Sequence, residues 1–405
     1  MALTPRLDLR GGRDCWQDDP KSLPQADGRP ETRVDLAIVG AGISGAMIAE
    51  RFTEIGASVV VIDRRLPVTG STAASTALVL WAPDVPFVEH VERYGQDGAR
   101  ARWHAVFDAV ERLGRRVDRL RLDCGWTARP DLYLAGKRLD ARALEHEGEA
   151  RWAAGLPTRR LGAGEVEDEF GVRAEGALVS EGAYQADPVA LARSLLRQAQ
   201  RQGATLLYPV DVVALVEVDH QVTLELDDGS KIRASRVVIA TGYEVEGEIP
   251  PGFLLGSSYA FATPPGELAA WRQGAIIWEA SDPYLYLRST ADGRIIVGGE
   301  DEDFADPKRR DALIPAKVRR LVDKARSRLP AVDFHIDCAW AATFGSSEDG
   351  LPAVGLRRGK TRIFSAHAFG GNGIAFAALA ADILVRAVDG APAATDGFFD
   401  PDRFR

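Results

Sequence analysis

The sequence predicts an α/β nucleotide-binding domain that is divided along the sequence and carries a second, β-rich domain. Taken over the whole chain, the fold class is α+β. Three separated segments have the strand-and-glycine pattern of a nucleotide site: Val34–Arg65, Val237–Gly242 and Arg362–Ile383. Two long insertions, Pro83–Glu181 and Glu244–Asp337, stand outside these segments. A divided nucleotide-binding domain with a separate capping domain explains this order.

The first segment has the parts of a Rossmann-like dinucleotide site in the required order. An apolar strand ends in Gly40-x-Gly42-x-x-Gly45, an amphipathic stretch follows, and a second apolar strand ends at Asp63. Gly40 allows the tight turn, Gly42 lets the backbone approach a pyrophosphate, and Gly45 lets the helix lie close to the strand. Amides at the helix start attract the anion, and Asp63 stands where a carboxylate accepts from a ribose hydroxyl. The alternative is a glycine-rich turn with no ligand.

The other two segments favour FAD over NAD. Val237–Ala240 is a short strand that runs into Thr241-Gly242, where backbone can meet a ligand. Near the C-terminus a strand precedes Gly370–Gly373, and an apolar helix follows. That second helix N-terminus would stabilise the negative charge that a flavin gains on reduction. An NAD-binding domain rarely needs such a return at the far end of the chain.

Composition excludes several classes of protein. The 405 residues are 46% hydrophobic and 27% charged, as in a globular chain, and the net charge of −9 argues against nucleic acid as a partner. We expect no membrane span and a cytoplasmic location, because no apolar run reaches bilayer length and the N-terminus lacks an apolar signal core. Cys15, Cys124 and Cys338 form no metal-ligand or disulfide pattern, so we expect no metal.

Periodicity and turn residues place the other elements. Helical spacing of apolar residues predicts a long helix over Ala99–Leu122, and Asp187-Pro188 is typical of a helix start. Asp228-Gly229 indicates a hairpin, Tyr259–Gly299 is rich in β-strand residues, and Arg309–Leu329 reverts to helix. We therefore expect residues 1–33 to form an N-terminal arm, residues 34–82, 182–243 and 338–405 to form the FAD-binding domain, and residues 83–181 and 244–337 to form the substrate-binding or capping domain.

These motifs resemble the D-amino-acid-oxidase-like, glycine-oxidase-like family of FAD-dependent oxidoreductases. The matching pieces cover nearly the whole chain in the family's order: VGAGISG, GSTAASTAL, DPVALARSLLRQAQRQGA, VVIATG, DGRIIVGGED, AWAATFGSSEDGLPAVG and FGGNGIAF. Among bacterial members, GSTAASTAL, GGEDED and the ending FFDPDRFR are most similar to gamma-glutamylputrescine-oxidase-like enzymes.

The resemblance implies a cofactor site and a role for each of its parts. The glycine turn would hold the pyrophosphate, Asp63 the ribose, and Val212 the adenine, and the hydroxyl-rich run after Gly70 would touch phosphate or flavin. For that run, an ordinary Ser/Thr turn remains the alternative. The cofactor-binding positions carried over in this way are Gly40, Ala41, Gly42, Ile43, Ser44, Gly45, Asp63, Arg64, Arg65, Ser71, Thr72, Ala74, Ser75, Thr76, Val212, Thr241, Gly242, Gly370, Gly371, Asn372, Gly373 and Ile374.

Three positions depart from the family pattern. Phe344 stands where glycine-oxidase-like members carry an Arg for the substrate carboxylate, which favours an amine without an α-carboxylate. Ala368 replaces a glycine before the Gly-Gly pair, a change that would tighten the flavin's edge. Ala342 falls near the Cys of members with covalent flavin, and no His lies in Gly70–Ala77, so we expect non-covalent FAD.

Candidate substrate residues are Tyr259, Tyr286, Arg288, Trp340, Phe344 and His367. Arg288 alternates with Tyr286 on one strand face and is our candidate cation for an acidic substrate tail, unless that face is a solvated edge. His367 would tune charge near the flavin, against the alternative of a core histidine. Trp340 is expected to form part of the pocket wall and to have no catalytic role. Glu300–Asp303 is expected to be a solvated acidic loop, with attraction of a polyamine as the alternative.

The predicted function is oxidation of the C–N bond of an amine or amino acid to an imine, by hydride transfer to the flavin with O2 or another acceptor. No nucleophile or metal is required, and the sequence offers neither a Ser-His-Asp set nor metal-ligand spacing. Two alternatives stay open. One is a flavin-dependent dehydrogenase of a 2-hydroxy acid, which needs a cation for the carboxylate. The other is a non-catalytic flavin-binding sensor protein.

Overall fold

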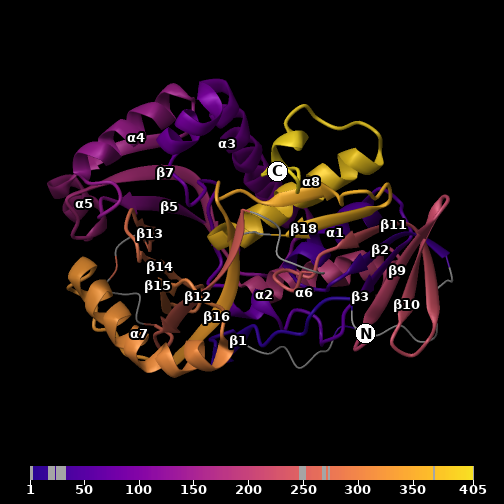
Figure 1. Cartoon of the computed structure of the whole chain (residues 1–405). Helices are drawn as coiled ribbons and strands as arrows, with labels where there is room; N and C mark the ends of the chain where they lie inside the picture. The colour runs from indigo at the N-terminus through magenta and orange to yellow at the C-terminus, as the bar shows by residue number, and fades with distance from the viewer. Residues whose placement is uncertain are drawn as a thin grey trace.

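Two β-sheets and the helices packed around them make up the protein (Figure 1). The computed structural model describes residues 3–16, 23, 33–245, 252–266, 271, 274–367 and 370–404. The helices are α1 (Ile43–Glu54), α2 (Ser71–Ala74), α3 (Phe87–Leu120), α4 (Ala141–Ala153), α5 (Ala163–Phe170), α6 (Pro188–Arg201), α7 (Pro307–Arg328) and α8 (Gly373–Val388), with 3-10 helices η2 (Gly370–Asn372) and η3 (Asp396–Phe399). The mixed arrangement confirms the predicted α/β fold.

The strands divide between the two sheets. The larger sheet contains β1 (Arg10–Gly12), β4 (Leu78–Val79), β5 (Thr127–Leu134), β6 (Thr158–Gly162), β7 (Gly176–Gln185), β12 (Phe253–Ala262), β13 (Ile276–Glu279), β14 (Leu285–Ser289), β15 (Ile295–Glu302) and β16 (Cys338–Ser347). The smaller sheet contains β2 (Arg33–Val39), β3 (Val59–Ile62), β8 (Thr205–Leu207), β9 (Val212–Val218), β10 (Gln221–Leu226), β11 (Lys231–Ile239), β17 (Ala353–Leu356) and β18 (Ile363–His367).

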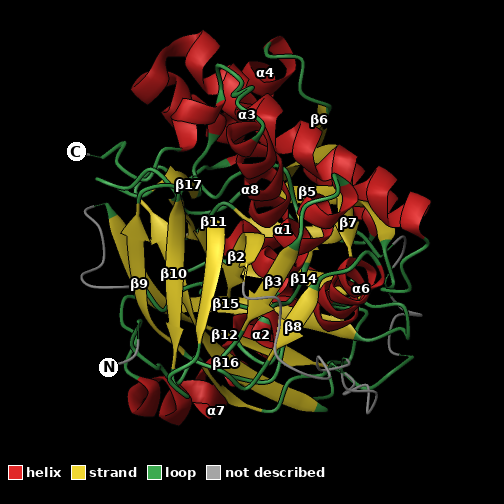
Figure 2. Cartoon of the chain, turned by 90° about the vertical axis from the view of Figure 1, so that its right-hand side faces the viewer, coloured by secondary structure: helices red, strands yellow, loops and turns green. Residues whose placement is uncertain are grey.

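The smaller sheet brings together strands that are remote in sequence. Its order is β17-β18-β11-β2-β3-β8, and the central pairs β18–β11, β11–β2, β2–β3 and β3–β8 are all parallel (Figure 2). Strands buried on both faces read as continuous apolar runs, as Val59–Ile62 does. Helix α1 packs against α6 and α8 beside this sheet. The carboxyl ends of β2, β3, β11 and β18 therefore meet at one edge.

An aspartate–proline pair starts two of the helices; the start of α6 was predicted, whereas α7 begins at Pro307, before the predicted Arg309, and α3 begins at Phe87, before the predicted Ala99. Asp187 caps α6, and its carboxylate accepts from the amides of Val189 and Ala190, with Pro188 at the first position. Asp306 and Pro307 begin α7 in the same way. These residues satisfy or remove amide donors that a helix start leaves without partners.

The larger sheet carries α7 on one side. Its order is β1-β16-β12-β15-β14-β13-β5-β7-β4, and α7 contacts β16, β15, β12, β1 and β14. The strand β16 pairs with β12 over its whole length, so this sheet includes a segment that we had grouped with the 338–405 part of the FAD-binding domain. The predicted domain boundaries stay a prediction, with β16 as the strand whose pairing bears on them.

One helix of the described residues is long and apolar enough to cross a membrane by length and composition alone. It spans Gly370–Val388, and 67% of its apolar window is buried inside the protein. It packs against α1 and α3. Its apolar surface is thus largely covered by the fold itself, as in the core helix of a folded domain.

Candidate active site

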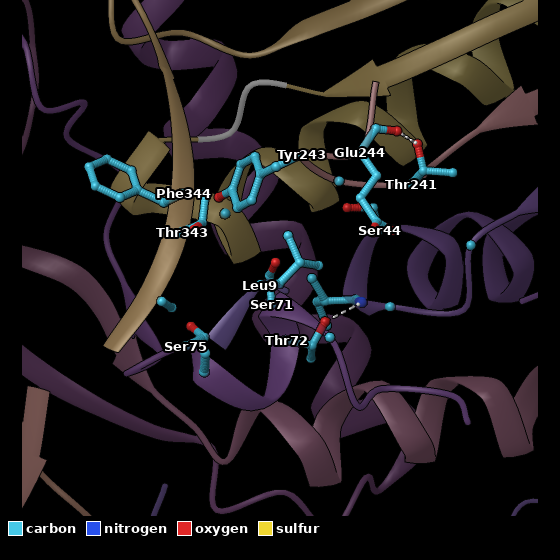
Figure 3. Close-up of a pocket in the computed structure, with 18 of the residues that line it drawn as sticks. Leu9, Ser44, Ser71, Thr72, Ser75, Thr241, Tyr243, Glu244, Thr343 and Phe344 are labelled. Carbon is cyan, nitrogen blue, oxygen red and sulfur yellow. Dashed lines mark hydrogen bonds between the residues drawn. The ribbon is translucent and has the colours of Figure 1, made fainter. Parts of the chain in front are cut away.

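One cavity brings the three predicted segments together. Its lining includes the turn between β2 and α1, the residues Thr241 and Gly242 after β11, and the start of α8. Figure 3 shows side chains from these segments, among them Ser44, Thr241 and Tyr243, around this pocket. All predicted cofactor-binding positions line the cavity except Ala41 and Gly45. Segments about 330 residues apart in sequence therefore reach the same space, as a flavin dinucleotide requires.

The glycine turn is closed by backbone contacts that only glycine allows. Gly40 has φ +114°, and a Cβ at this position would lie 2.4 Å from the carbonyl oxygen of Ala240. A Cβ at Gly45 would lie 1.9 Å from the carbonyl oxygen of Gly40. Gly45 therefore lies behind the turn and allows the close approach of α1 to β2, although it does not line the cavity.

Asp63 ties the turn to the end of β3. Its Oδ2 accepts from the amide of Ala41 at 2.7 Å, and its Oδ1 accepts from the amide of Arg65 at 2.8 Å. Burial raises the pKa of Asp63 despite these bonds. The carboxylate lines the cavity, and each oxygen keeps a further lone pair for a ribose hydroxyl.

The N-terminal arm closes the Asp63 end of the cavity. Leu3 and Thr4 line it, and the amide of Leu3 donates to the carbonyl of Val212. Arg65 donates through both Nη atoms to Glu244 at 2.7 and 2.6 Å, and Glu244 also accepts from the amide of Leu7. Arg65 is therefore already neutralised by a carboxylate. The sequence predicts an arm over the surface, and the structure also makes it part of the cavity wall.

Three long side chains hold the hydroxyl-rich loop that follows α2. Trp340 Nε1 donates to the carbonyl of Ala74 at 2.9 Å, Trp16 Nε1 to that of Ser75 at 3.0 Å, and Arg288 Nε to that of Thr76 at 2.5 Å. The three carbonyls are consecutive. Ser71 begins α2 just before the loop, and its buried Oγ lines the cavity with no hydrogen-bond partner among the described residues. The loop is thus rigidly held with a hydroxyl free for a ligand.

The late glycine turn presents the start of α8 to the cavity. Gly370–Ile374 all line it, and α8 has no acidic residue in its first turn. Asn372 Nδ2 donates to the carbonyl of Ala82, and the amide of Gly371 donates to Asp84 Oδ2 at 3.1 Å. Burial raises the pKa of Asp84. The predicted departure at Ala368 lies outside the described residues.

The structure separates the six predicted substrate residues into two groups. Tyr286 and Phe344 line the cavity. Tyr259 is buried on the side of the larger sheet that faces α7, with its ring 5.3 Å from Lys317 Nζ. Trp340 lies behind the loop it holds and does not line the cavity, so its predicted place in the pocket wall stays a prediction.

Arg288 and His367 also lie outside the lining. The guanidinium of Arg288 is buried and donates to three backbone carbonyls, those of Thr76, Ser289 and Ala186. Tyr284 and Tyr286 line the cavity, as the predicted alternation of side chains requires. Arg288 shares this alternation, but its longer side chain extends beyond the cavity and donates to backbone carbonyls instead. Burial lowers the pKa of His367 to about 4, and its Nε2 has no partner.

Sequence reasoning predicted Tyr286 but missed Tyr243 and Asp84, and it expected Asp301 in a solvated acidic loop, whereas Asp301 belongs to β15 and lines the cavity. Tyr243, Tyr284 and Tyr286 define what we call the tyrosine end of the cavity, and Asp84 and Asp301 line the same cavity. Trp278 and Ser258 also belong to the lining. The sequence signal for Asp301 was the alternation of side chains along a strand. Glu300 and Glu302 share one face of β15, toward α7, so Asp301 between them points to the other face.

The lining fits a flavin dinucleotide held without a covalent bond. The amides at the start of α1 and the unpartnered Ser71 Oγ would suit a pyrophosphate, the amides at the start of α8 a flavin, and the Asp63 carboxylate a ribose. Neither cysteine nor histidine occurs among the described lining residues, and Ala342 lines the cavity at the position where we noted the missing cysteine.

The family comparison agrees with this site. The FAD dependent oxidoreductase family (DAO) matches residues 35–387, which is most of the chain. This chain belongs to that family. It is an FAD-dependent oxidoreductase, and the recognition of the D-amino-acid-oxidase-like family from its motifs is confirmed. FAD is accordingly its cofactor, and the described lining contains no cysteine or histidine of the kind that bonds to the flavin in covalent members.

Curated relatives of this FAD-dependent oxidoreductase are distant. The probable oxidoreductase OrdL of Haemophilus influenzae is 21% identical over 369 residues, covering 88% of this chain and 83% of that protein. The putative Rieske 2Fe-2S iron-sulfur protein YhfW of Bacillus subtilis is 29% identical over 178 residues, 44% of this chain. The match spans only 34% of that relative, so its whole activity does not transfer.

Solved structures show the same fold. Glycine oxidase from Geobacillus kaustophilus superposes with a TM-score of 0.74 at 19% identity, covering 92% of this chain and 98% of that one. L-proline dehydrogenase from P. horikoshii superposes with a TM-score of 0.77 at 19% identity, covering 94% and 98%. At this identity the likeness establishes the architecture of this FAD-dependent oxidoreductase and leaves its substrate to the residues of the cavity.

Proposed function

We propose that this FAD-dependent oxidoreductase oxidises the C–N bond of an amine that lacks a carboxylate beside the reacting nitrogen. One observation carries the proposal: among the described residues, the tyrosine end of the cavity has no cation to bind a carboxylate. Phe344 occupies the position where glycine-oxidase-like members carry an Arg. Arg288, our candidate cation for an acidic substrate group, donates its hydrogen bonds to backbone carbonyls instead. A bidentate carboxylate partner is therefore lacking.

The chain's own residues bind, orient and shield. Bound FAD supplies a hydride acceptor for the carbon beside the amine nitrogen, and water then hydrolyses the resulting imine. The amides at the start of α8 that do not donate to Asp84 would favour negative charge on a flavin held there. Tyr243, Tyr286 and Phe344 provide an apolar wall that excludes water from the reacting amine. O2 or another acceptor then removes the electrons.

The alternatives receive less support from the lining. A 2-hydroxy acid would need the same missing cation for its carboxylate. A non-catalytic sensor is at odds with membership of an oxidoreductase family. The finer expectations, a gamma-glutamylputrescine-oxidase-like substrate, O2 as the acceptor and a cytoplasmic location, stay predictions.

An anaerobic screen tests the proposed function. The holoenzyme is mixed with amines, with glycine and D-alanine, and with lactate, and loss of the yellow flavin absorbance is followed. We expect amines to bleach the flavin at least tenfold faster than glycine or D-alanine, the order of difference expected when a charged group is left unpaired. Rapid bleaching by glycine or lactate, with none by amines, would overturn the proposal.

A further inference from the structure

We propose that the tyrosine end of the cavity is a dication site and that the substrate is an alkyl diamine or polyamine, whose second ammonium group is held between Asp301 and Asp84. The inference rests on the proposed amine oxidation and narrows it to a substrate class. It is carried by two carboxylates that line one cavity beside aromatic rings, with no cation of the described lining near them.

Asp301 is turned into the cavity by the strand that carries it. Its neighbours on β15, Glu300 and Glu302, face α7, where Lys317 Nζ lies 2.6 Å from Glu302 Oε1 and Lys324 Nζ lies 2.5 Å from Glu300 Oε1. Asp301 between them points the other way and lines the cavity. Its Oδ1 is buried without a hydrogen-bond partner. The nearby ammonium of Lys317 pairs with Glu302, and the neighbour of Asp301 in the lining is the neutral hydroxyl of Ser258, so no cation of the described residues forms a salt bridge with this carboxylate.

Asp84 supplies the second carboxylate from the other wall. It follows the hydroxyl-rich loop, and its Oδ2 accepts from the amide of Gly371. Arg138 donates to the backbone carbonyl of Asp84 at 3.3 Å and its charge favours ionisation of Asp84, but its guanidinium pairs with the Glu89 carboxylate and does not line the cavity. The two carboxyl groups interact electrostatically. Burial raises the pKa of Asp301 to about 7, and the charge of Asp84 adds to this effect.

Aromatic rings complete the site. Tyr286 on β14 and Tyr284 just before this strand lie side by side, with ring centroids 5.5 Å apart and planes tilted by 40°. Tyr243 and Trp278 also line the cavity. The faces of such rings attract ammonium groups that have left water, and their edges pack against a methylene chain. Rings plus carboxylates therefore recognise an alkyl chain that ends in a cation.

Two positive charges suit the site better than one. Two buried carboxylates cannot both ionise at low cost without nearby positive charge. A monoamine brings one cation, which must also lose its proton at the reacting nitrogen before a hydride leaves the adjacent carbon. A diamine keeps its far ammonium for the acids while its near amine reacts. An ω-amino acid of the same length would place a carboxylate against two acids, which costs affinity.

The test measures binding apart from turnover. Dithionite-reduced holoenzyme cannot oxidise an amine, so calorimetry on it gives dissociation constants for 1,4-diaminobutane, n-butylamine and 4-aminobutyrate. We expect the diamine to bind about tenfold more tightly than butylamine, the scale of one added charge contact, and 4-aminobutyrate to bind more weakly than both. Equal affinities for the diamine and butylamine overturn the dication site.

Asp301→Asn supplies the matching variant. We expect it to retain FAD and to reduce the diamine-to-butylamine preference to about twofold or less, because the shape is kept and the charge is lost. Asp303→Asn, an exposed acid in the same run that does not line the cavity, is the control and should keep the full preference. An unchanged preference in Asp301→Asn also overturns the site. If amines bleach the flavin without diamine preference, only the inference fails; if no amine bleaches it, the proposed function fails.

Discussion

At the scale of single residues, the long side chains predicted to touch substrate mostly hold the loop that the cofactor meets. Trp340 and Arg288 donate hydrogen bonds to the backbone carbonyls of Ala74 and Thr76 in the same loop. Sequence alternation shows which face of a strand a residue occupies, but it does not show how far a long side chain reaches. Trp340 and Arg288 are thus positioning residues.

Trp340→Phe tests this positioning role. The change keeps an aromatic ring in the buried site, although a smaller one, and removes the Nε1 donor, which leaves the carbonyl of Ala74 without this bond. We expect the free energy of unfolding to fall by about 1 kcal/mol and FAD to dissociate faster, with the preference among amines unchanged. Urea titration and the fluorescence of released flavin measure both effects. Trp152→Phe, on an exposed side chain, is the control. A changed amine preference with normal stability would instead place Trp340 at the substrate.

At the scale of elements, the N-terminal arm is part of the cofactor site. Strand β1 adds to the edge of the larger sheet beside β16, and the residues before it reach the Asp63 end of the cavity. The contacts run from the backbone of Leu3 and Leu7 to Val212 and Glu244. The arm therefore lies where it would have to separate before the Asp63 end of a bound dinucleotide could leave.

Deletion of residues 1–8 should accelerate loss of FAD. The deletion keeps β1 and removes Leu3 and Thr4 from the lining, so the bound cofactor gains a path to solvent. We expect flavin to be released about tenfold faster on dilution, which corresponds to a barrier lower by about 1.4 kcal/mol. Arg6→Ala, at an exposed position outside the lining, should release flavin as the full chain does. Identical release rates for all three proteins would show that the arm is not a barrier.

Elements marked by local chemistry could be predicted, and contacts across the sheets could not. The run Val59–Ile62 became β3 with the same bounds, and Asp187-Pro188 began α6, because both signals lie within a few residues. The acidic run Glu300–Asp303 was noticed in the sequence, but the place of Asp301 in the same cavity as Asp84 was not, because it depends on how distant elements pack. Asp301 faces the cavity while its two neighbours on β15 pair with lysines of α7.

At the scale of the whole molecule, buried titratable groups give opposite contributions to stability as pH falls. Burial raises the pKa of Asp131 and Asp301 to about 7, so the folded state binds their protons first and gains stability as pH falls below 7. His367 acts the other way, with a pKa lowered to about 4. The pH dependence of the free energy of unfolding is therefore the sum of contributions from several groups. The contribution of one residue is obtained from the difference between the wild type and a variant that lacks it.

His367→Gln isolates the imidazole. Burial is the largest cause of its low pKa, and the charges of Arg357 and Arg403 add to it, while Phe253 packs edge-on at 5.8 Å. The unfolded chain takes up the histidine proton near pH 6.5 and the folded chain only near pH 4, so stability is lost as pH falls between these values. We expect the wild type to lose up to about 3 kcal/mol more than the glutamine variant between pH 7 and pH 4. Urea unfolding at pH 7, 5.5 and 4.5 measures this gap. Curves that stay parallel would mean that the folded protein accommodates the protonated ring, and that His367 is open to water or to an acid.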